Sequence, residues 1–165
     1  MRHNSAPFLL GCLLASSAIF MTGTTASAQD DIDPAIAAAV KARKAHMDLS
    51  AFNIGILGAM AKGEIPYDAN VAESAAQNLA ALSRLDESQY WIPGSDIEAL
   101  GKDHTGALPS LWSDNKFQDH VKNLQDATDA MVKVAGQGLD QLRGQMGPLG
   151  KACGGCHEDH RAPKD

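Results

Sequence analysis

The sequence predicts an all-α protein, built as an antiparallel four-helix bundle. Four stretches carry apolar residues at steps of three and four positions, which is the spacing of amphipathic helices. No stretch alternates between apolar and polar residues with the period of two that half-buried strands show. Two of the connections between these stretches are short and one is long, and short connections join antiparallel neighbours in helix bundles.

The first helix is predicted over residues 34–62. Asp33 is a suitable N-cap, and Pro34 occupies the first helical position, where its missing N–H costs nothing. Gly63 follows the last residue and is expected near the C-cap. One face of this helix repeats every seven residues, at Val40, Met47, Ile54 and Ala61.

The second helix is predicted from the N-cap Asp68 to about residue 85, and a long connection over residues 86–109 follows it. A connection of this length in a small domain indicates a packing or functional role. The expected buried face of the second helix comprises Val71, Ala75, Leu79 and Leu82.

The third helix is predicted over residues 110–135, with Ser110 as its N-cap. The fourth begins after Gly138, and Pro148 within it predicts a kink. The third helix should bury Phe117, Val121, Leu124, Thr128 and Met131. The methionines Met60, Met131 and Met146 are expected in the core.

The run Cys153-Gly154-Gly155-Cys156-His157 carries the chemistry of the chain. Two thiols three positions apart, followed at once by an imidazole, form the attachment motif of c-type haem. The thiols can join the haem vinyl groups as thioethers, and the His157 ring can bind the iron from one side. In a helix, Cys153 and His157 lie one turn apart. The sequence therefore predicts one covalent haem c with its iron.

Zinc binding and redox chemistry are the two other uses of a cysteine pair with this spacing. A zinc site would need ligands of other types, because beyond the N-terminal segment the chain has no further cysteine. A redox dithiol normally opens a helix beside a βαβ unit, and no stretch here predicts a strand.

Residues 1–28 are predicted to be a cleaved signal peptide, which leaves residues 29–165 as one haem domain. Arg2 supplies a positive start, residues 7–21 are mostly apolar, and Ala26-Ser27-Ala28 forms a small-residue cleavage site. Export to the periplasm follows from this segment.

The chain carries a formal net charge of −6 and no basic cluster, which argues against nucleic acid and anionic membranes as partners. The acidic charge suits a basic redox protein partner, or solubility alone. No later apolar run is long enough to span a membrane.

Residues 34–161 resemble the class II cytochromes c, the cytochrome c′ superfamily. The matching runs are residues 58–64, 66–69, 111–113 and 147–153, and Arg161 completes a Cys-x-x-Cys-His-x-x-x-Arg pattern. The resemblance implies a four-helix bundle around one covalent haem, and it allows a homodimer through the first two helices. It implies no catalytic turnover.

Members of this superfamily are of two kinds. The low-spin kind has a methionine as sixth iron ligand and carries electrons, whereas the five-coordinate kind binds nitric oxide or carbon monoxide. Met47 lies eleven residues before Gly58 and four after Arg43, at the position that separates the two. A thioether there can bind iron, or it can simply fill the core.

From this we predict a His157/Met47-ligated electron carrier of the low-spin kind, with the gas-binding cytochrome c′ as the alternative. Arg43 is expected either to contact a haem propionate or to solvate a helix face. Arg161 is expected beside the His157 ring. His46 is a weaker ligand candidate and should be partly exposed, while His120 and His160 are expected at the surface.

Overall fold

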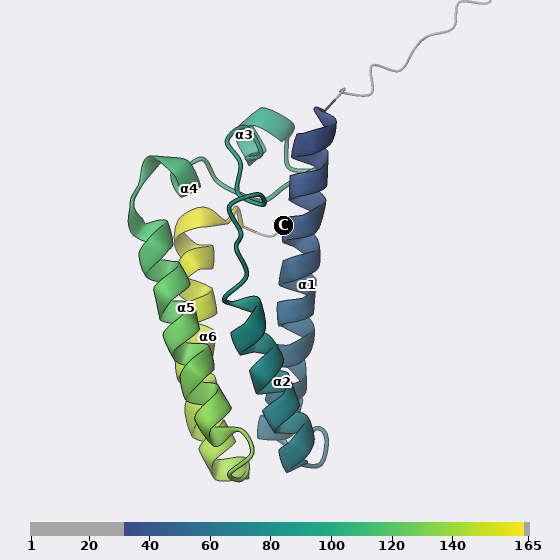
Figure 1. The fold of residues 1–165 in the computed structure, drawn as a ribbon, viewed down its shortest axis with the longest axis vertical. Coiled ribbons are helices and arrows are strands. Elements are labelled where there is room, and N and C mark those ends of the chain that lie inside the picture. The colour runs from purple at the N-terminus through teal and green to yellow at the C-terminus, as the bar shows by residue number, and fades with distance from the viewer. Residues whose placement is uncertain (1–31, 164–165) are drawn as a thin grey trace, which may run out of the picture. The chain divides into compact units, whose positions relative to one another are not determined.

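The computed structural model describes residues 32–163, and four long helices dominate them. These are α1 (Pro34–Lys62), α2 (Ala69–Leu82), α5 (Lys116–Val134) and α6 (Leu139–His160), with the short helices α3 (Ile97–Leu100) and α4 (Ser110–Ser113) between α2 and α5 (Figure 1). The long helices pack in the pairs α1–α2, α2–α5, α5–α6 and α6–α1, which closes a ring of four neighbours. The all-α four-helix bundle is confirmed.

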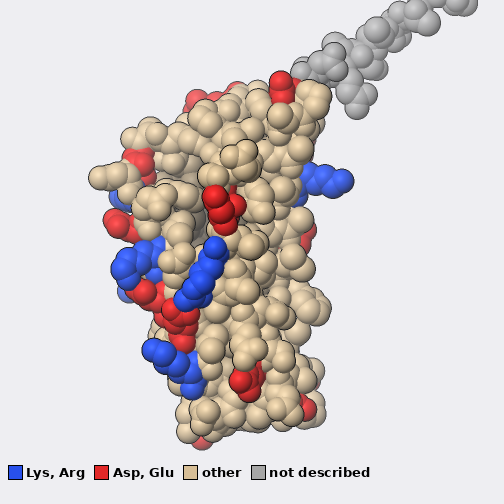
Figure 2. Space-filling view, in the orientation of Figure 1, with Lys and Arg blue, Asp and Glu red and all other residues tan. Residues whose placement is uncertain are grey.

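The predicted signal peptide, residues 1–28, lies outside the described residues. Within residues 32–163 no helix is both long and apolar enough to cross a membrane. On the face drawn in Figure 2, the Lys and Arg side chains lie among Asp and Glu side chains rather than in a patch of their own.

Both ends of α1 are capped as the sequence predicts. The Asp33 Oδ1 atom accepts from the backbone N–H groups of Ala35 and Ile36, at 2.8 and 3.3 Å. Gly63 adopts a φ of 78°, a left-handed conformation that glycine enters without a Cβ penalty. The capping residues Asp33 and Gly63 therefore determine where the longest helix of the fold begins and ends.

The buried face of α2 differs from the predicted one at Val71, whose side chain is 44% exposed. Ala72, Ala75, Ala76 and Leu79 are buried instead. These four positions follow the i, i+3, i+4, i+7 pattern, and Val71 lies about 100° round the helix from Ala72. The prediction was wrong for Val71 because alanines, rather than the larger valine, form this contact face.

The predicted third helix is divided into α4 and α5, and Ser110 is not its N-cap. Asp114 interrupts the helix, because its Oδ1 atom accepts from the backbone N–H of Lys116 at 3.0 Å. A short side chain that bonds the backbone two residues on competes with the helical ladder. The Ser110 hydroxyl donates to the carbonyl oxygen of Asp159 in α6, at 2.8 Å.

Helix α6 is continuous from Leu139 to His160 and includes Pro148. The predicted kink at Pro148 stays a prediction. Around α6, the core contains Leu142 and Leu149 together with the buried Met60 and Met131, as expected. Met146 packs against this core, which also agrees with the sequence-based prediction.

Candidate haem site

A cavity of about 1160 Å³ opens inside the bundle. It is larger than the ~300–1,000 Å³ of most small-molecule sites. Helices α1, α5 and α6 and the connection after α2 all contribute walls, and most of these walls are apolar. Its lining includes Met47, Ile54, Leu124, Cys153, Cys156 and His157.

The three residues of the predicted attachment motif meet in this cavity. Cys153, Cys156 and His157 lie in α6, line the cavity together and are partly buried. Neither cysteine is in a disulfide, so both sulfur atoms are available for thioether bonds. A large apolar cavity that receives two free thiols and one imidazole from a single helix face fits a covalent haem.

The two thiols are poorly suited to zinc or redox chemistry. Burial raises the pKa of the Cys153 thiol. It also raises the pKa of Cys156 to about 11, with the negative charges of Glu87 and Asp159 adding to the effect and Arg161 opposing it. Zinc binding and disulfide exchange both use the thiolate, which a raised pKa disfavours. The environment therefore favours the protonated thiols over the thiolates that zinc binding and disulfide exchange use.

Met47 lies on the α1 wall of the same cavity. Its side chain is 36% exposed, and it lines the cavity together with Ile54 two turns further along the helix. The first residue of the predicted stripe, Val40, is buried but is not among the lining residues. A role of Met47 as an iron ligand stays a prediction.

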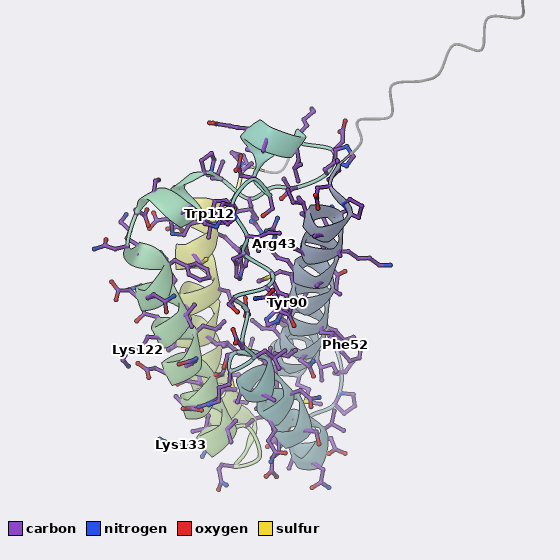
Figure 3. The ribbon with its side chains drawn as sticks, turned by 45° about the horizontal axis from the view of Figure 1, so that its top comes forward. Arg43, Phe52, Tyr90, Trp112, Lys122 and Lys133 are labelled. Carbon is purple, nitrogen blue, oxygen red and sulfur yellow. The ribbon has the colours of Figure 1, made fainter. Side chains whose placement is uncertain are left out.

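Arg43 is a buried anchor for the connection between α2 and α5. Its Nη1 atom donates to the Tyr90 carbonyl oxygen and the Ser95 hydroxyl, at 3.1 and 3.0 Å. Its Nη2 atom donates to the Ser95 carbonyl oxygen and the Thr105 hydroxyl, at 2.9 and 2.8 Å. Figure 3 shows Arg43 reaching from α1 toward the segment that carries Tyr90.

These contacts decide between the two expectations for Arg43 only in part. The side chain is buried, so it does not solvate a helix face. It is not among the residues that line the cavity, and a contact with a haem propionate stays a prediction. Its guanidinium carbon also lies 4.7 Å from the centre of the Trp91 ring, within range of a cation–π contact.

Arg161 borders the cavity just after α6 ends. Its backbone N–H donates to the His157 carbonyl oxygen at 3.2 Å, and the residue forms an isolated antiparallel bridge with Ala107. These two contacts hold the Arg161 backbone beside His157, the last residue of the attachment motif. The influence of its side chain on the His157 ring stays a prediction.

The histidines are more buried than the sequence suggested. His46 is buried, lines the cavity and places Nε2 3.4 Å from Glu87 Oε1, so the expectation of partial exposure was wrong. His160 is buried and His120 is partly buried, so neither is a surface residue. The connection after α2 covers His46, and α4 covers His160. Nothing in the sequence indicates this burial of His46, because its partner Glu87 lies in a connection without helical periodicity.

A helix bundle whose last helix brings two free thiols and a histidine into one large cavity defines a c-type haem protein. A family model described as cytochrome c′ matches residues 38–161. The chain is 39% identical to cytochrome c-554 of Cereibacter sphaeroides over 124 residues, which cover 74% of this chain and 91% of that protein.

Solved structures agree with this match. The structure titled cytochrome c′ from Rhodobacter Spheriodes superimposes with a TM-score of 0.75 at 35% identity, covering 78% of this chain and 98% of that one. A nitric oxide complex of a variant of cytochrome c prime from Alcaligenes xylosoxidans gives a TM-score of 0.64 at 30% identity, with 76% and 94% covered. The chain belongs to the cytochrome c′ family, whose members bind covalent haem c with its iron.

Proposed function

We propose that this protein binds a small diatomic gas, nitric oxide or carbon monoxide, at the haem of its cavity and performs no catalytic turnover. The observation that carries this proposal is the apolar wall that α1 contributes to the cavity of His157. Met47 and Ile54 line this cavity, and a small uncharged gas can bind beside such side chains. The nitric oxide complex of the relative from Alcaligenes xylosoxidans supports the same choice.

The residues of this chain would divide the work as follows. Cys153 and Cys156 would hold the haem as thioethers, and the His157 imidazole would bind the iron from the α6 side. The iron would then supply one coordination position for a gas, or one electron for transfer. Met47 and Ile54 form an apolar wall on the α1 side, and such a wall excludes water from the opposite face.

A second function, electron transfer with Met47 as the sixth ligand, rests on a specific observation. Met47 lines the same cavity as His157, from a different helix of the bundle. A thioether ligand would raise the haem potential and would occupy the position that a gas needs. The chemistry of the site does not identify the redox protein partners of such a carrier.

Carbon monoxide added to the reduced protein separates the two functions. Gas binding predicts that the wild-type absorption spectrum changes at once, and that Met47→Leu gives the same response. Electron transfer predicts no change in the wild type and a change in Met47→Leu, because leucine keeps the volume but removes the sulfur. Met146→Leu removes a thioether from the core outside the cavity and is the matched control. No response in either wild type or Met47→Leu would contradict the gas-binding proposal.

Haem attachment is tested independently. Cys153→Ser combined with Cys156→Ser should abolish the haem that stays with the chain in denaturing electrophoresis, whereas a haem band that persists would refute thioether attachment. We also propose that the protein works in the periplasm, because residues 1–28 have the features of a cleaved signal peptide. The mass of the mature protein isolated from its host would show whether it begins at Gln29.

A further inference from the structure

Beside the haem motif, where α4, α5 and α6 meet, two histidines and a carboxylate form a second cluster. It consists of His120 from α5 and of Asp159 and His160 from the end of α6. Each residue offers one metal-ligating atom, and the three atoms lie within 4.8 Å of one another. Only His120 borders the haem cavity, and the proposed haem chemistry uses none of the three.

Two of these ligands are already spaced for a shared ion. His120 Nε2 lies 3.1 Å from Asp159 Oδ2. With metal–ligand bonds of ~2.0–2.2 Å, two ligands of a tetrahedral ion are about 3.4 Å apart. The His120 and His160 rings are nearly perpendicular, with centroids 5.4 Å apart.

The hydrogen bonds of His160 define which of its nitrogens is free. The Ser110 hydroxyl has one proton and donates it to the Asp159 carbonyl oxygen. The contact of 2.9 Å between Ser110 Oγ and His160 Nδ1 therefore requires Nδ1 to be the donor. The neutral ring then carries its lone pair on Nε2.

That lone pair has no hydrogen-bond partner among the described residues, although His160 is only 3% exposed. An unpartnered buried acceptor is costly, and it points to a ligand that the protein atoms do not supply. Metal-binding histidines commonly donate their other N–H in this way, which fixes the ring. The carboxylate of Asp114, 3.7 Å from Nε2, adds a further oxygen nearby.

The cluster also attracts positive charge. Lys116 Nζ lies 3.2 Å from the same Asp159 oxygen that faces His120. The Lys116 side chain is largely exposed, so it can move into solvent without disturbing the core. A divalent ion would replace its ammonium group at the carboxylate.

We propose that His120, Asp159 and His160 bind one divalent transition metal ion of the zinc, nickel or copper type. Imidazole nitrogen suits these three metals, and one carboxylate completes a common ligand set for zinc. The ion joins the start of α5 to the end of α6 and leaves a position for Asp114 or water. It does not depend on whether the haem binds gas or transfers electrons.

Isothermal titration of the chelator-treated, haem-containing protein with Zn²⁺ tests this site. The wild type should bind one ion per chain, and His120→Gln and Asp159→Asn should each weaken binding at least ~tenfold. Lys116→Gln should bind zinc more tightly than the wild type, because the competing ammonium is removed. His104→Gln, which changes an exposed histidine of the connection before α4, should leave the affinity unchanged.

A second measurement guards against loss of fold. The haem absorption and the circular dichroism of each variant should match those of the wild type, and zinc should raise the melting temperature of the wild type but not of His120→Gln. If His160→Gln unfolds, His120→Gln and Asp159→Asn still decide the question, because both side chains are partly exposed. Absence of binding, or binding that His120→Gln weakens no more than His104→Gln does, overturns the proposal.

Discussion

The guanidinium of Arg43 donates to both the hydroxyl and the carbonyl oxygen of Ser95, at 3.0 and 2.9 Å. These bonds join α1 to a connection more than fifty positions further along the chain. The same connection supplies Glu87, Trp91 and Thr105 to the wall of the haem cavity. One buried cation thus determines where a wall of the cavity stands.

Arg43→Lys should destabilise the protein and loosen this wall. Lysine keeps the charge but lacks the planar fork that serves four acceptors at once. Buried acceptors left without donors cost about 1–3 kcal/mol each, so we expect the free energy of unfolding to fall by roughly 2–4 kcal/mol. Urea unfolding measures this change. Amide exchange should accelerate in residues 90–105 more than in α5, and equal acceleration throughout would contradict a local anchor.

Tyr67→Phe should cost about 1 kcal/mol of stability, the usual net value of a hydrogen bond. The Tyr67 hydroxyl donates to the Ala135 carbonyl oxygen at 2.8 Å and accepts from the Gly138 N–H at 3.0 Å. It therefore ties the turn after α1 to the turn between α5 and α6. Thermal unfolding of the two proteins is the measurement. Because this end of the bundle is remote from the haem motif, an altered haem spectrum in Tyr67→Phe would contradict the purely structural role.

The parts of the fold that depend on local chemistry were predictable from the sequence. The caps of α1 at Asp33 and Gly63 follow from residue type and position, and the Cys153–Cys156–His157 motif follows from spacing. The role of Arg43 was not predictable, because its acceptors are distant in sequence and lie in a segment without periodicity. The split between α4 and α5 depends on a single bond from Asp114, which competes with the helix and leaves the apolar pattern intact.

Burial was harder to predict than helix position. The periodic stripe of α1 indicates which face packs against other helices, but His46 is covered by the connection and not by a helix. His160 is likewise buried beneath α4, a helix of four residues that no period can reveal. His46 and His160 therefore contact segments whose path only the tertiary structure shows.

Asp86→Asn should reduce stability at neutral pH and have a smaller effect in acid. The Asp86 Oδ1 atom accepts from the Ser88 backbone N–H at 3.0 Å, and hydrogen bonds to Ser88 hold the pKa of this carboxyl below its usual range. A carboxyl whose pKa is lowered on folding contributes stability above its unfolded pKa of about 3.9, and loses it as the pH falls through the folded value. Urea unfolding of both proteins at about pH 7, 5 and 3 should show the difference shrinking toward pH 3. A difference that grows in acid would contradict this assignment.

The last prediction concerns self-association through α1, which the resemblance to the cytochromes c′ allows. Phe52 is 66% exposed on α1, and Leu49 is exposed three residues earlier on the same face. Figure 3 shows Phe52 on the outer side of α1, away from the other long helices. Exposed apolar side chains grouped on one helix face are typical of an interface between protein chains. We expect the protein to be a homodimer in solution, with Phe52 near the contact.

Phe52→Glu should convert this dimer to a monomer, because a dimer would place two carboxylates in an apolar contact at the cost of their hydration. Light scattering coupled to gel filtration gives the mass directly. Leu85→Glu is the matched control, since Leu85 is also an exposed apolar residue, 48% exposed, but lies beyond the end of α2. The control should remain a dimer. A wild-type protein that is monomeric at every concentration tested, or a Phe52→Glu variant that stays dimeric, would exclude this face of α1 as the interface.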